Sequence, residues 1–352
     1  MKYLSAEFQP DYQNIVDAAL NKLPRRMPLY EHIINWPVIE HVLEQKKFAL
    51  PAGLNDTEAA YYRMAGFNRI MGYDAVPFEV GSCSAFPGAG ALGMHIKGVI
   101  QTMDDYQKYD WDAVPDRYMQ IAAPHYEALR KTMPDGMKAI GAVGNGVFEV
   151  VQDLVGFMDL CLMKVDDPEL YAMLFTKIGD IHCEIWSRVI DLYDDIFCVY
   201  RFGDDLGYKM QTMLSPDDVR EHILPQYKRV ISLIKRKSGK PFLLHSCGNL
   251  SEVMDDIIAC GINAKHSNED VIAPFSEYIR LYGDRIGLFG GIDTDVLCDI
   301  SGVELRPYMD NIIKQTLGKP GFALGSGNSI TAYISFDRYF TMNEMIRVAR
   351  GE

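Results

Sequence analysis

The hydrophobic pattern of the chain alternates between short apolar runs and longer segments with helical periodicity. Each apolar run ends in polar or turn-forming residues, which is typical of buried strands. The eight runs are Pro28–Tyr30, Ala75–Val80, Lys138–Val143, Phe197–Phe202, Pro241–Leu244, Ile262–Lys265, Ile286–Phe289 and Phe322–Leu324. Alternating strands and helices predict an α/β fold with a parallel sheet, and eight strands allow it to close as a (β/α)8 TIM barrel. An open doubly wound sheet is the alternative.

Three segments carry clear helix signals. Asp217–Lys237 follows Ser215 and Pro216, a serine cap and a proline at the first helical position. Ser251–Ala259 has an apolar face and ends just before a glycine. Asp11–Leu23 predicts an N-terminal helix that precedes the first strand of the barrel.

The segment from about Ser82 to Asp135, after the second strand, is long for a single crossover. We therefore expect a long insertion there, with extra helices or a lid over the barrel mouth. It contains a literal G-x-G-x-x-G between Gly88 and Gly93, but this motif does not directly follow a strand, as a dinucleotide-binding loop does. We interpret it as a flexible loop. Without a linker or internal repeat, residues 1–352 are expected to form a single domain.

Composition and charge exclude several classes of protein. The chain is 48% hydrophobic and 24% charged, as in ordinary globular proteins, and its formal net charge of -13 argues against nucleic acid and anionic membrane surfaces. The longest uncharged run, Val80–Ile96, is too short and too rich in glycine to cross a membrane. Seven cysteines at irregular spacing indicate reduced thiols, and no secretory signal begins the chain, so we expect a cytoplasmic protein.

In barrels of this type, chemistry occurs at the carboxyl ends of the strands. Those positions hold the polar residues Glu31, His32, Glu79, Asn145, Asp204, Asp205, His245, Cys247, Glu269, Asp293, Ser326 and Asn328. Glu79, Asp204 and Asp205 are our candidate catalytic residues. The two aspartates either orient the substrate or a metal-ligand histidine, or belong to an acidic loop that caps the next helix. Asp293 and Asn328 stand beside glycines, so each is either a ligand or a turn residue.

The sharpest chemical signal is the pair His245 and Cys247. Residues i and i+2 of an extended chain point the same way, so the pair can offer nitrogen and sulfur to one ion. The next strand leads to His266 and Glu269, and neighbouring strands lie about 4.8 Å apart. A set of His, Cys and Glu favours zinc, because magnesium and calcium prefer oxygen alone. The alternative is a buried histidine that caps a turn beside an inert thiol.

Five motifs occur in order along the chain: Phe202-Gly-Asp-Asp-Leu-Gly207, Leu214-Ser-Pro216, His245-Ser-Cys-Gly-Asn249, Gly290-Gly-Ile-Asp293 and Gly325-Ser-Gly-Asn-Ser329. From about Asn21 onward the chain resembles the uroporphyrinogen decarboxylase superfamily. It is more similar to the corrinoid-linked zinc methyltransferases, such as methylcobalamin:coenzyme M and O-demethylase methyltransferases, than to the decarboxylases. The decarboxylases bind porphyrin carboxylates with an arginine-rich stretch after the first strand, whereas Tyr30–Pro37 here contains no arginine.

The resemblance implies a zinc ion held by His245, Cys247 and Glu269. It implies methyl transfer between a small methylated substrate and a corrinoid protein, and a homodimer. A distal cysteine completes the ligand set in this branch, and Ser326 stands at that position here. Either zinc is lost, or it remains with a harder ligand set, which favours a methyl ether over a thiol. Ser326, Asn328 and His266 are candidate substrate contacts.

Two other functions stay open at this point. One is a metal-free decarboxylase of a porphyrin or another small acid, although the missing arginines count against it. The other is a non-catalytic corrinoid-binding protein, in which Ser326 marks a site that has lost its metal.

Overall fold

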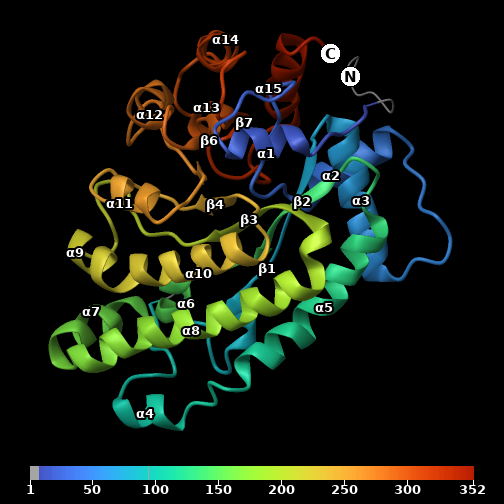
Figure 1. Ribbon diagram of the computed structural model, residues 1–352. Coiled ribbons are helices and arrows are strands. Elements are labelled where there is room, and N and C mark those ends of the chain that lie inside the picture. Colours follow the sequence, from blue (N-terminus) through green and yellow to red (C-terminus); the bar gives the residue numbers. More distant parts are fainter. Residues whose placement is uncertain (1–7, 94) are drawn as a thin grey trace.

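The computed structural model describes residues 8–93 and 95–352 (Figure 1). Its centre is a curled sheet of seven parallel strands, hydrogen-bonded in the order β1 to β7. The strands are β1 (Ala75–Val80), β2 (Lys138–Val143), β3 (Phe197–Gly203), β4 (Phe242–His245), β5 (Ala264–His266), β6 (Gly287–Ile292) and β7 (Phe322–Ser326). The predicted TIM-barrel fold class is therefore confirmed.

The first predicted strand, Pro28–Tyr30, is reduced to a single bridge. Leu29 pairs in parallel with Leu324 of β7, and no ladder within the described ranges joins this segment to β1. Pro77 inside β1 has no amide hydrogen to donate, which suits a strand with a free edge. The regular strands in the described ranges thus number seven rather than the predicted eight. The segment around Leu29 takes the place of the eighth strand through its bridge to β7.

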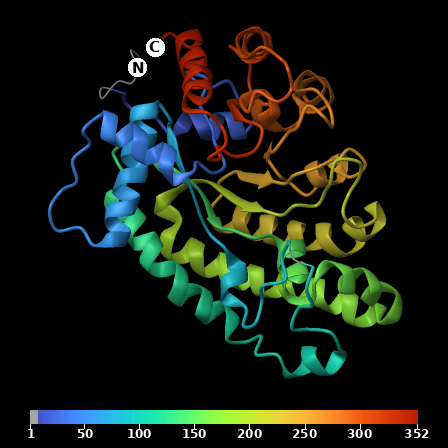
Figure 2. The same ribbon diagram turned by 180° about the vertical axis from the view of Figure 1, so that it is seen from behind.

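Helices surround the sheet on its outer side, as both views show (Figures 1 and 2), except the first helix, which covers one end of the barrel. They are α1 (Gln13–Ala19), α2 (Trp36–Gln45), α3 (Asp56–Met71), α4 (Met103–Lys108), α5 (Val114–Thr132), α6 (Val147–Val155), α7 (Phe157–Asp166), α8 (Pro168–Tyr193), α9 (Pro216–Asp218), α10 (Leu224–Lys237), α11 (Met254–Ala259), α12 (Phe275–Tyr282), α13 (Thr294–Leu297), α14 (Leu305–Thr316) and α15 (Phe336–Ala349). Shorter turns are η1 (Ser82–Ala85), η2 (Asp194–Ile196) and the π-helical η3 (Val219–Ile223). Of the helices described, none is both long and apolar enough for a membrane span.

The predicted helices are present with shifted ends. The segment Asp217–Lys237 corresponds to α9, η3 and α10 in succession, and Ser215 caps it by accepting the amide hydrogen of Asp218 at 3.2 Å. Helix α11 begins three residues later than predicted, because a turn closed between Leu250 and Val253 precedes it. Helix α1 covers only the centre of the predicted segment.

The predicted insertion lies between β1 and β2 and contains η1, α4 and α5. Its glycine-rich loop follows η1 rather than a strand, as expected for a loop that does not bind a dinucleotide. The loop is fastened to α6, since the amide of Leu92 donates to the Asp153 carboxylate at 2.7 Å and the amide of Ala91 to the Asp153 carbonyl at 3.2 Å. Its role as a lid stays a prediction.

Helix α1 packs into the amino-terminal end of the barrel. Its buried residues Ile15, Ala18 and Ala19 form one cluster with residues of the barrel interior: Tyr30, Ala75, Ile140, Cys198, Val199, Leu243, Ala264, Phe289 and Ala323. A Cβ atom at Gly287, the first residue of β6, would lie 2.7 Å from the carbonyl oxygen of Ala18. Glycine at this position therefore lets α1 approach the strands, and the helix covers the end of the barrel opposite the carboxyl ends of the strands.

The packing of α1 predicts the effect of one substitution. Ile15→Ala is expected to lower the free energy of unfolding by about 2–5 kcal/mol, because the removed atoms leave a cavity in a fully buried position. Urea-induced unfolding followed by circular dichroism measures this change. Leu23, which is 60% exposed, provides a control, and Leu23→Ala is expected to change the free energy by less than about 0.5 kcal/mol. Equal effects of the two substitutions would contradict the packing of α1.

Candidate functional site

Parallel pairing brings the carboxyl ends of the central strands to one level. Gly203 of β3 is paired with His245 of β4, and His245 is paired with His266 of β5. Asp204 and Asp205 follow β3, and Cys247 follows β4. The candidate site therefore lies at the end of the barrel opposite α1.

His245 and Cys247 face each other as the sequence predicts. Nε2 of His245 lies 3.6 Å from Sγ of Cys247, and His245 is only 6% exposed. Zinc binds nitrogen at about 2.0–2.1 Å and sulfur at about 2.3 Å, so two ligand atoms of a tetrahedral zinc ion lie about 3.6 Å apart. The pair therefore fits a zinc ion without rearrangement.

The sulfur of Cys247 has both hydrogen-bond donors and a carboxylate near it. Two donors point at Sγ: the Asn328 amide at 3.3 Å and the Ser267 hydroxyl at 3.8 Å. Burial, together with the nearby Asp205 carboxylate, raises the pKa of the thiol to about 12. A thiolate at this position therefore needs a cation beside it, which a zinc ion would supply.

Asp205 is the third potential ligand near this pair. Its Oδ1 atom accepts the amide hydrogen of Cys247 at 2.8 Å and lies 3.9 Å from Nε2 of His245. The three ligand atoms lie within 4.8 Å of one another. Glu269, predicted as the third ligand, is half-buried in the loop after β5 and is in neither group of potential ligands found among the described residues. Its place as a ligand stays a prediction.

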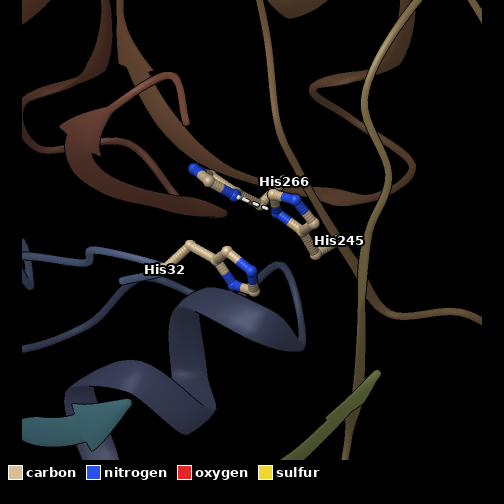
Figure 3. Close-up of side chains that lie close together, drawn as sticks. All are labelled: His32, His245 and His266. Atoms are coloured by element: carbon tan, nitrogen blue, oxygen red, sulfur yellow. Dashed lines mark hydrogen bonds between the residues drawn. The ribbon is translucent and has the colours of Figure 1, made fainter. Parts of the chain in front are cut away.

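The second group of potential ligands consists of His32, His245 and His266 (Figure 3). The rings of His32 and His245 are stacked, with centroids 3.6 Å apart and planes inclined by 6°. Imidazole binds a metal through a lone pair in the plane of its ring, so two parallel rings cannot both direct their lone pairs at one ion. The group with Asp205 and Cys247 is therefore the better metal site, and His32 packs against it.

His266 contacts His245 from the side opposite Cys247. Nδ1 of His266 lies 2.8 Å from Nδ1 of His245 (Figure 3), and its Nε2 lies 3.0 Å from the carbonyl oxygen of Ser326. Burial lowers the pKa of both histidines, to about 3 for His266. Both rings are therefore neutral at neutral pH.

Ser326 and Asn328 occupy different positions in the site. The hydroxyl and the amide of Ser326 both donate to the carboxyl group of the buried Glu31, and the amide contact measures 3.0 Å. Only the carbonyl of Ser326 contacts the histidines. Of the two residues, Asn328 is the one whose side chain contacts Cys247. The sequence predicts both as substrate contacts, whereas in the structure their side chains contact different residues.

The two adjacent aspartates also differ in their contacts. Asp204 is fully buried and accepts hydrogen bonds from the amides of Phe148 and Glu149 and from the Tyr227 hydroxyl, at 3.0, 2.8 and 2.6 Å. It thus caps the start of α6, rather than the helix that follows it in sequence. Burial raises its pKa to about 7. Asp205 faces Cys247 instead, and the catalytic roles of both stay predictions.

Glu79 forms an ion pair that sequence reasoning missed. A guanidinium nitrogen of Arg201 donates to Glu79 at 2.7 Å, and another donates to the Tyr30 hydroxyl at 2.9 Å. Arg201 is only 1% exposed and lies within the apolar run Phe197–Phe202. A single arginine inside an otherwise apolar run is the signal, since buried arginine needs a partner.

Two further residues of the strand ends have structural roles. Asp293 caps α13 by accepting the amide hydrogens of Asp295 and Val296 at 2.7 and 3.2 Å, so the turn interpretation of this residue holds. Lys265, which sequence reasoning also missed, is buried behind the site with its ammonium group donating to the carbonyl of Ser246 at 3.4 Å. Burial lowers its pKa to about 8.

Comparison with known proteins adds a family and a fold. The family described as "Uroporphyrinogen decarboxylase (URO-D)" matches residues 85–348. Among solved structures, a methyltransferase from Methanosarcina mazei has a TM-score of 0.67 at 14% sequence identity, over 96% of this chain and 97% of that chain. At this identity, the likeness shows the fold alone. No curated protein sequence matches the chain.

Glycosidases are also found among the structural matches. Endo-glycoceramidase II from Rhodococcus sp. has a TM-score of 0.40 at 12% identity, over 88% of this chain and 74% of that chain. An endoglucanase from an uncultured bacterium has a TM-score of 0.42 at 8% identity, over 98% and 97%. These scores are too low to support an argument about function.

The burial of Glu31 predicts a dependence of stability on pH. Burial raises the pKa of Glu31 to about 8, above its ordinary value of 4.5, so the folded chain binds a proton that the unfolded chain releases. Between these two pKa values, raising the pH is expected to destabilise the fold by up to about 1.4 kcal/mol per pH unit. Glu31→Gln keeps a neutral side chain and is expected to remove this contribution.

Urea-induced unfolding of both proteins between pH 5 and pH 8.5 checks this prediction. The difference in free energy of unfolding between Glu31→Gln and the parent is expected to grow in favour of the variant as the pH rises. A difference that does not change with pH would show that folding does not raise the pKa of Glu31, and would contradict the prediction.

Proposed function

Because the chain belongs to the uroporphyrinogen decarboxylase (URO-D) family, we propose that it is a zinc-dependent methyltransferase acting with a corrinoid protein. It would move a methyl group between a small methylated substrate and the corrinoid of its partner. The observation that carries the proposal is the 3.6 Å spacing between Nε2 of His245 and Sγ of Cys247 at the barrel mouth. This spacing is the one expected for two ligands of a single zinc ion.

His245, Cys247 and a carboxylate would hold the ion. Asp205 is the carboxylate nearest to the pair, whereas the resemblance to the methyltransferase branch favours Glu269. A bound zinc ion would act as a Lewis acid that polarises the substrate heteroatom. Asn328 and Ser267 would keep Cys247 oriented through their hydrogen bonds to its sulfur.

The ligand set favours a methyl ether as substrate, with a thiol as the second choice. Cys247 is the only cysteine among the potential ligands found in the described parts of the chain, and the other ligands offer nitrogen and oxygen. A zinc ion with a single thiolate has more affinity for oxygen than one with two. In the proposed demethylation, the C–O bond of the ether breaks, and the oxygen keeps the bonding electrons and takes up a proton from solvent. The methyl group would form a new bond to the cobalt of the reduced corrinoid partner, which would supply the electron pair.

Porphyrin decarboxylation is the second candidate, since the family carries that name. Its substrate bears several carboxylates, and the stretch Tyr30–Pro37 offers no arginine to bind them. Arg201, the guanidinium buried in β3, is already paired with Glu79. Methyl transfer is therefore the better proposal, and we expect it to take place in the cytoplasm, in a homodimer of single-domain chains.

The metal content of the purified protein is the first prediction. We expect about one zinc ion per chain by elemental analysis. Its three protein ligands would leave a fourth position for substrate. His245→Ala and Cys247→Ala are each expected to weaken zinc binding by more than about 100-fold, as measured by competition with a chelator. Cys260→Ala is the matched control, since Cys260 contacts the Leu224 carbonyl rather than the site, and it is expected to retain zinc.

Two further variants identify the third ligand. Asp205→Asn is expected to weaken zinc binding more than Glu269→Gln, because Asp205 lies with His245 and Cys247. The reverse order would support Glu269. A parent protein without zinc, even after reconstitution under reducing conditions, would exclude the zinc mechanism.

Methyl transfer itself is the next prediction. With a methyl ether and a reduced corrinoid protein, the parent is expected to form the free alcohol, detected by chromatography. Cys247→Ala is expected to lower the rate by about 100- to 1000-fold, through loss of charge stabilisation at the leaving oxygen. Turnover of uroporphyrinogen without added metal would favour the decarboxylase, and corrinoid binding without transfer would favour a non-catalytic protein.

A further inference from the structure

The carbonyl of Ser326 and the rings of His266 and His245 form a continuous row of hydrogen bonds. Nε2 of His266 lies 3.0 Å from the Ser326 carbonyl oxygen, and its Nδ1 lies 2.8 Å from Nδ1 of His245 (Figure 3). His266 is fully buried and His245 is 6% exposed. Both contacts are therefore shielded from solvent and hold the two rings in one arrangement.

The Ser326 carbonyl at one end of the row determines which nitrogen atoms of the two rings carry a hydrogen. A carbonyl oxygen only accepts hydrogen bonds, so Nε2 of His266 carries a hydrogen. A neutral imidazole has a single N–H group, so Nδ1 of His266 is an acceptor and the hydrogen between the rings belongs to Nδ1 of His245. Nε2 of His245, the atom 3.6 Å from Cys247, is then left with a free lone pair.

The opposite assignment is unfavourable. If His266 donated from Nδ1, its Nε2 would direct a lone pair at the Ser326 carbonyl oxygen, and two acceptors would face each other. A doubly protonated His266 would avoid this contact, but the ring is buried and lies near the cations Lys265 and Arg201. A fully buried imidazolium without an anionic partner is unfavourable.

Gly290 of β6 makes room for the row where it passes from β5 to β7. A Cβ atom at this position would lie 2.7 Å from the Ser326 carbonyl oxygen and 2.9 Å from Cδ2 of His266. The φ angle of Gly290 is 98°, which favours glycine as well. The backbone between the two strands thus accommodates the contact between the ring and the carbonyl.

We propose that His266 is a positioning residue: anchored by the Ser326 carbonyl, it holds His245 in the Nδ1–H tautomer and so directs the Nε2 lone pair toward a metal ion. A ligand histidine is oriented by the hydrogen bond of its other nitrogen, and this second contact is commonly made to a carboxylate or a carbonyl. Here another histidine makes it. The inference rests on the proposed zinc site but does not depend on the proposed methyl transfer.

The tautomer is measured in the metal-free protein by two-bond proton–nitrogen correlation NMR of the histidine rings. His245→Gln identifies the signals of His245 by their loss. In the parent we expect Nδ1 of His245 to be protonated and Nε2 to be unprotonated. His266→Leu removes the acceptor, and we expect the Nε2–H form of His245, or a mixture of the two forms.

Two variants separate positioning from packing. His266→Gln offers an amide oxygen toward His245 and an amide hydrogen toward the Ser326 carbonyl, so it is expected to retain the tautomer. His32→Leu removes the ring stacked on His245, but Nδ1 of His32 has no hydrogen-bond partner among the described residues. We therefore expect His32→Leu to leave the tautomer of His245 unchanged.

Zinc affinity gives the second measurement. His266→Leu is expected to lower it by about 10- to 100-fold, the usual effect of losing a partner of a ligand histidine, whereas His266→Gln stays close to the parent. Thermal unfolding checks that each variant folds. An Nε2–H form of His245 in the parent, or an unchanged tautomer in a folded His266→Leu, would overturn the proposal.

The two proposals can fail separately. The Nδ1–H tautomer in a parent protein that binds no zinc would support the row of hydrogen bonds and overturn the zinc site. Normal zinc affinity without methyl transfer would leave the role of His266 supported and overturn the proposed reaction.

Discussion

The parallel register of β3, β4 and β5 is the constraint on which the rest of the site depends. Because the strands are parallel and in register, Gly203, His245 and His266 end at one height, and the loops after them start from there. Side chains separated by about twenty residues in sequence are thereby brought within hydrogen-bond distance. The hydrogen bonds between the strand backbones fix this arrangement. The polar side chains at the mouth are therefore brought together by the sheet rather than by their own contacts.

The mouth also shows how a barrel can hold many charged groups near one another. Two buried ionisable groups there have specific partners: Arg201 has Glu79, and Asp204 has the amides at the start of α6. Burying charges without such partners is expensive in free energy. Asp205, which is less buried than Asp204, stays available near the sulfur of Cys247. These paired groups therefore surround the three potential metal ligands Asp205, His245 and Cys247.

Much of the fold could be predicted from the sequence because strand periodicity and turn residues act locally. The ends of β1 and β2 agree with the sequence prediction, and the His-x-Cys motif places His245 and Cys247 as expected. The direction of a side chain after a strand end is harder to predict. A shift of one residue turns a side chain from the inside of the barrel to its outside. For this reason Ser326 turns to Glu31, and Asp205 rather than Glu269 lies beside the pair. These positions depend on tertiary packing and have no local signal.

Helix α1 ties the beginning of the chain to its end. It contacts β6 and β7, which are synthesised some 270 to 300 residues later. Contacts of such long sequence separation raise the contact order of a protein and slow its folding. During synthesis, the apolar face of α1 can pack against β3 once that strand has emerged, but its contacts with β6 and β7 form only much later. The barrel interior can therefore be completed only after β7 has been synthesised, and a chaperone that shields α1 until then would have a clear physical task.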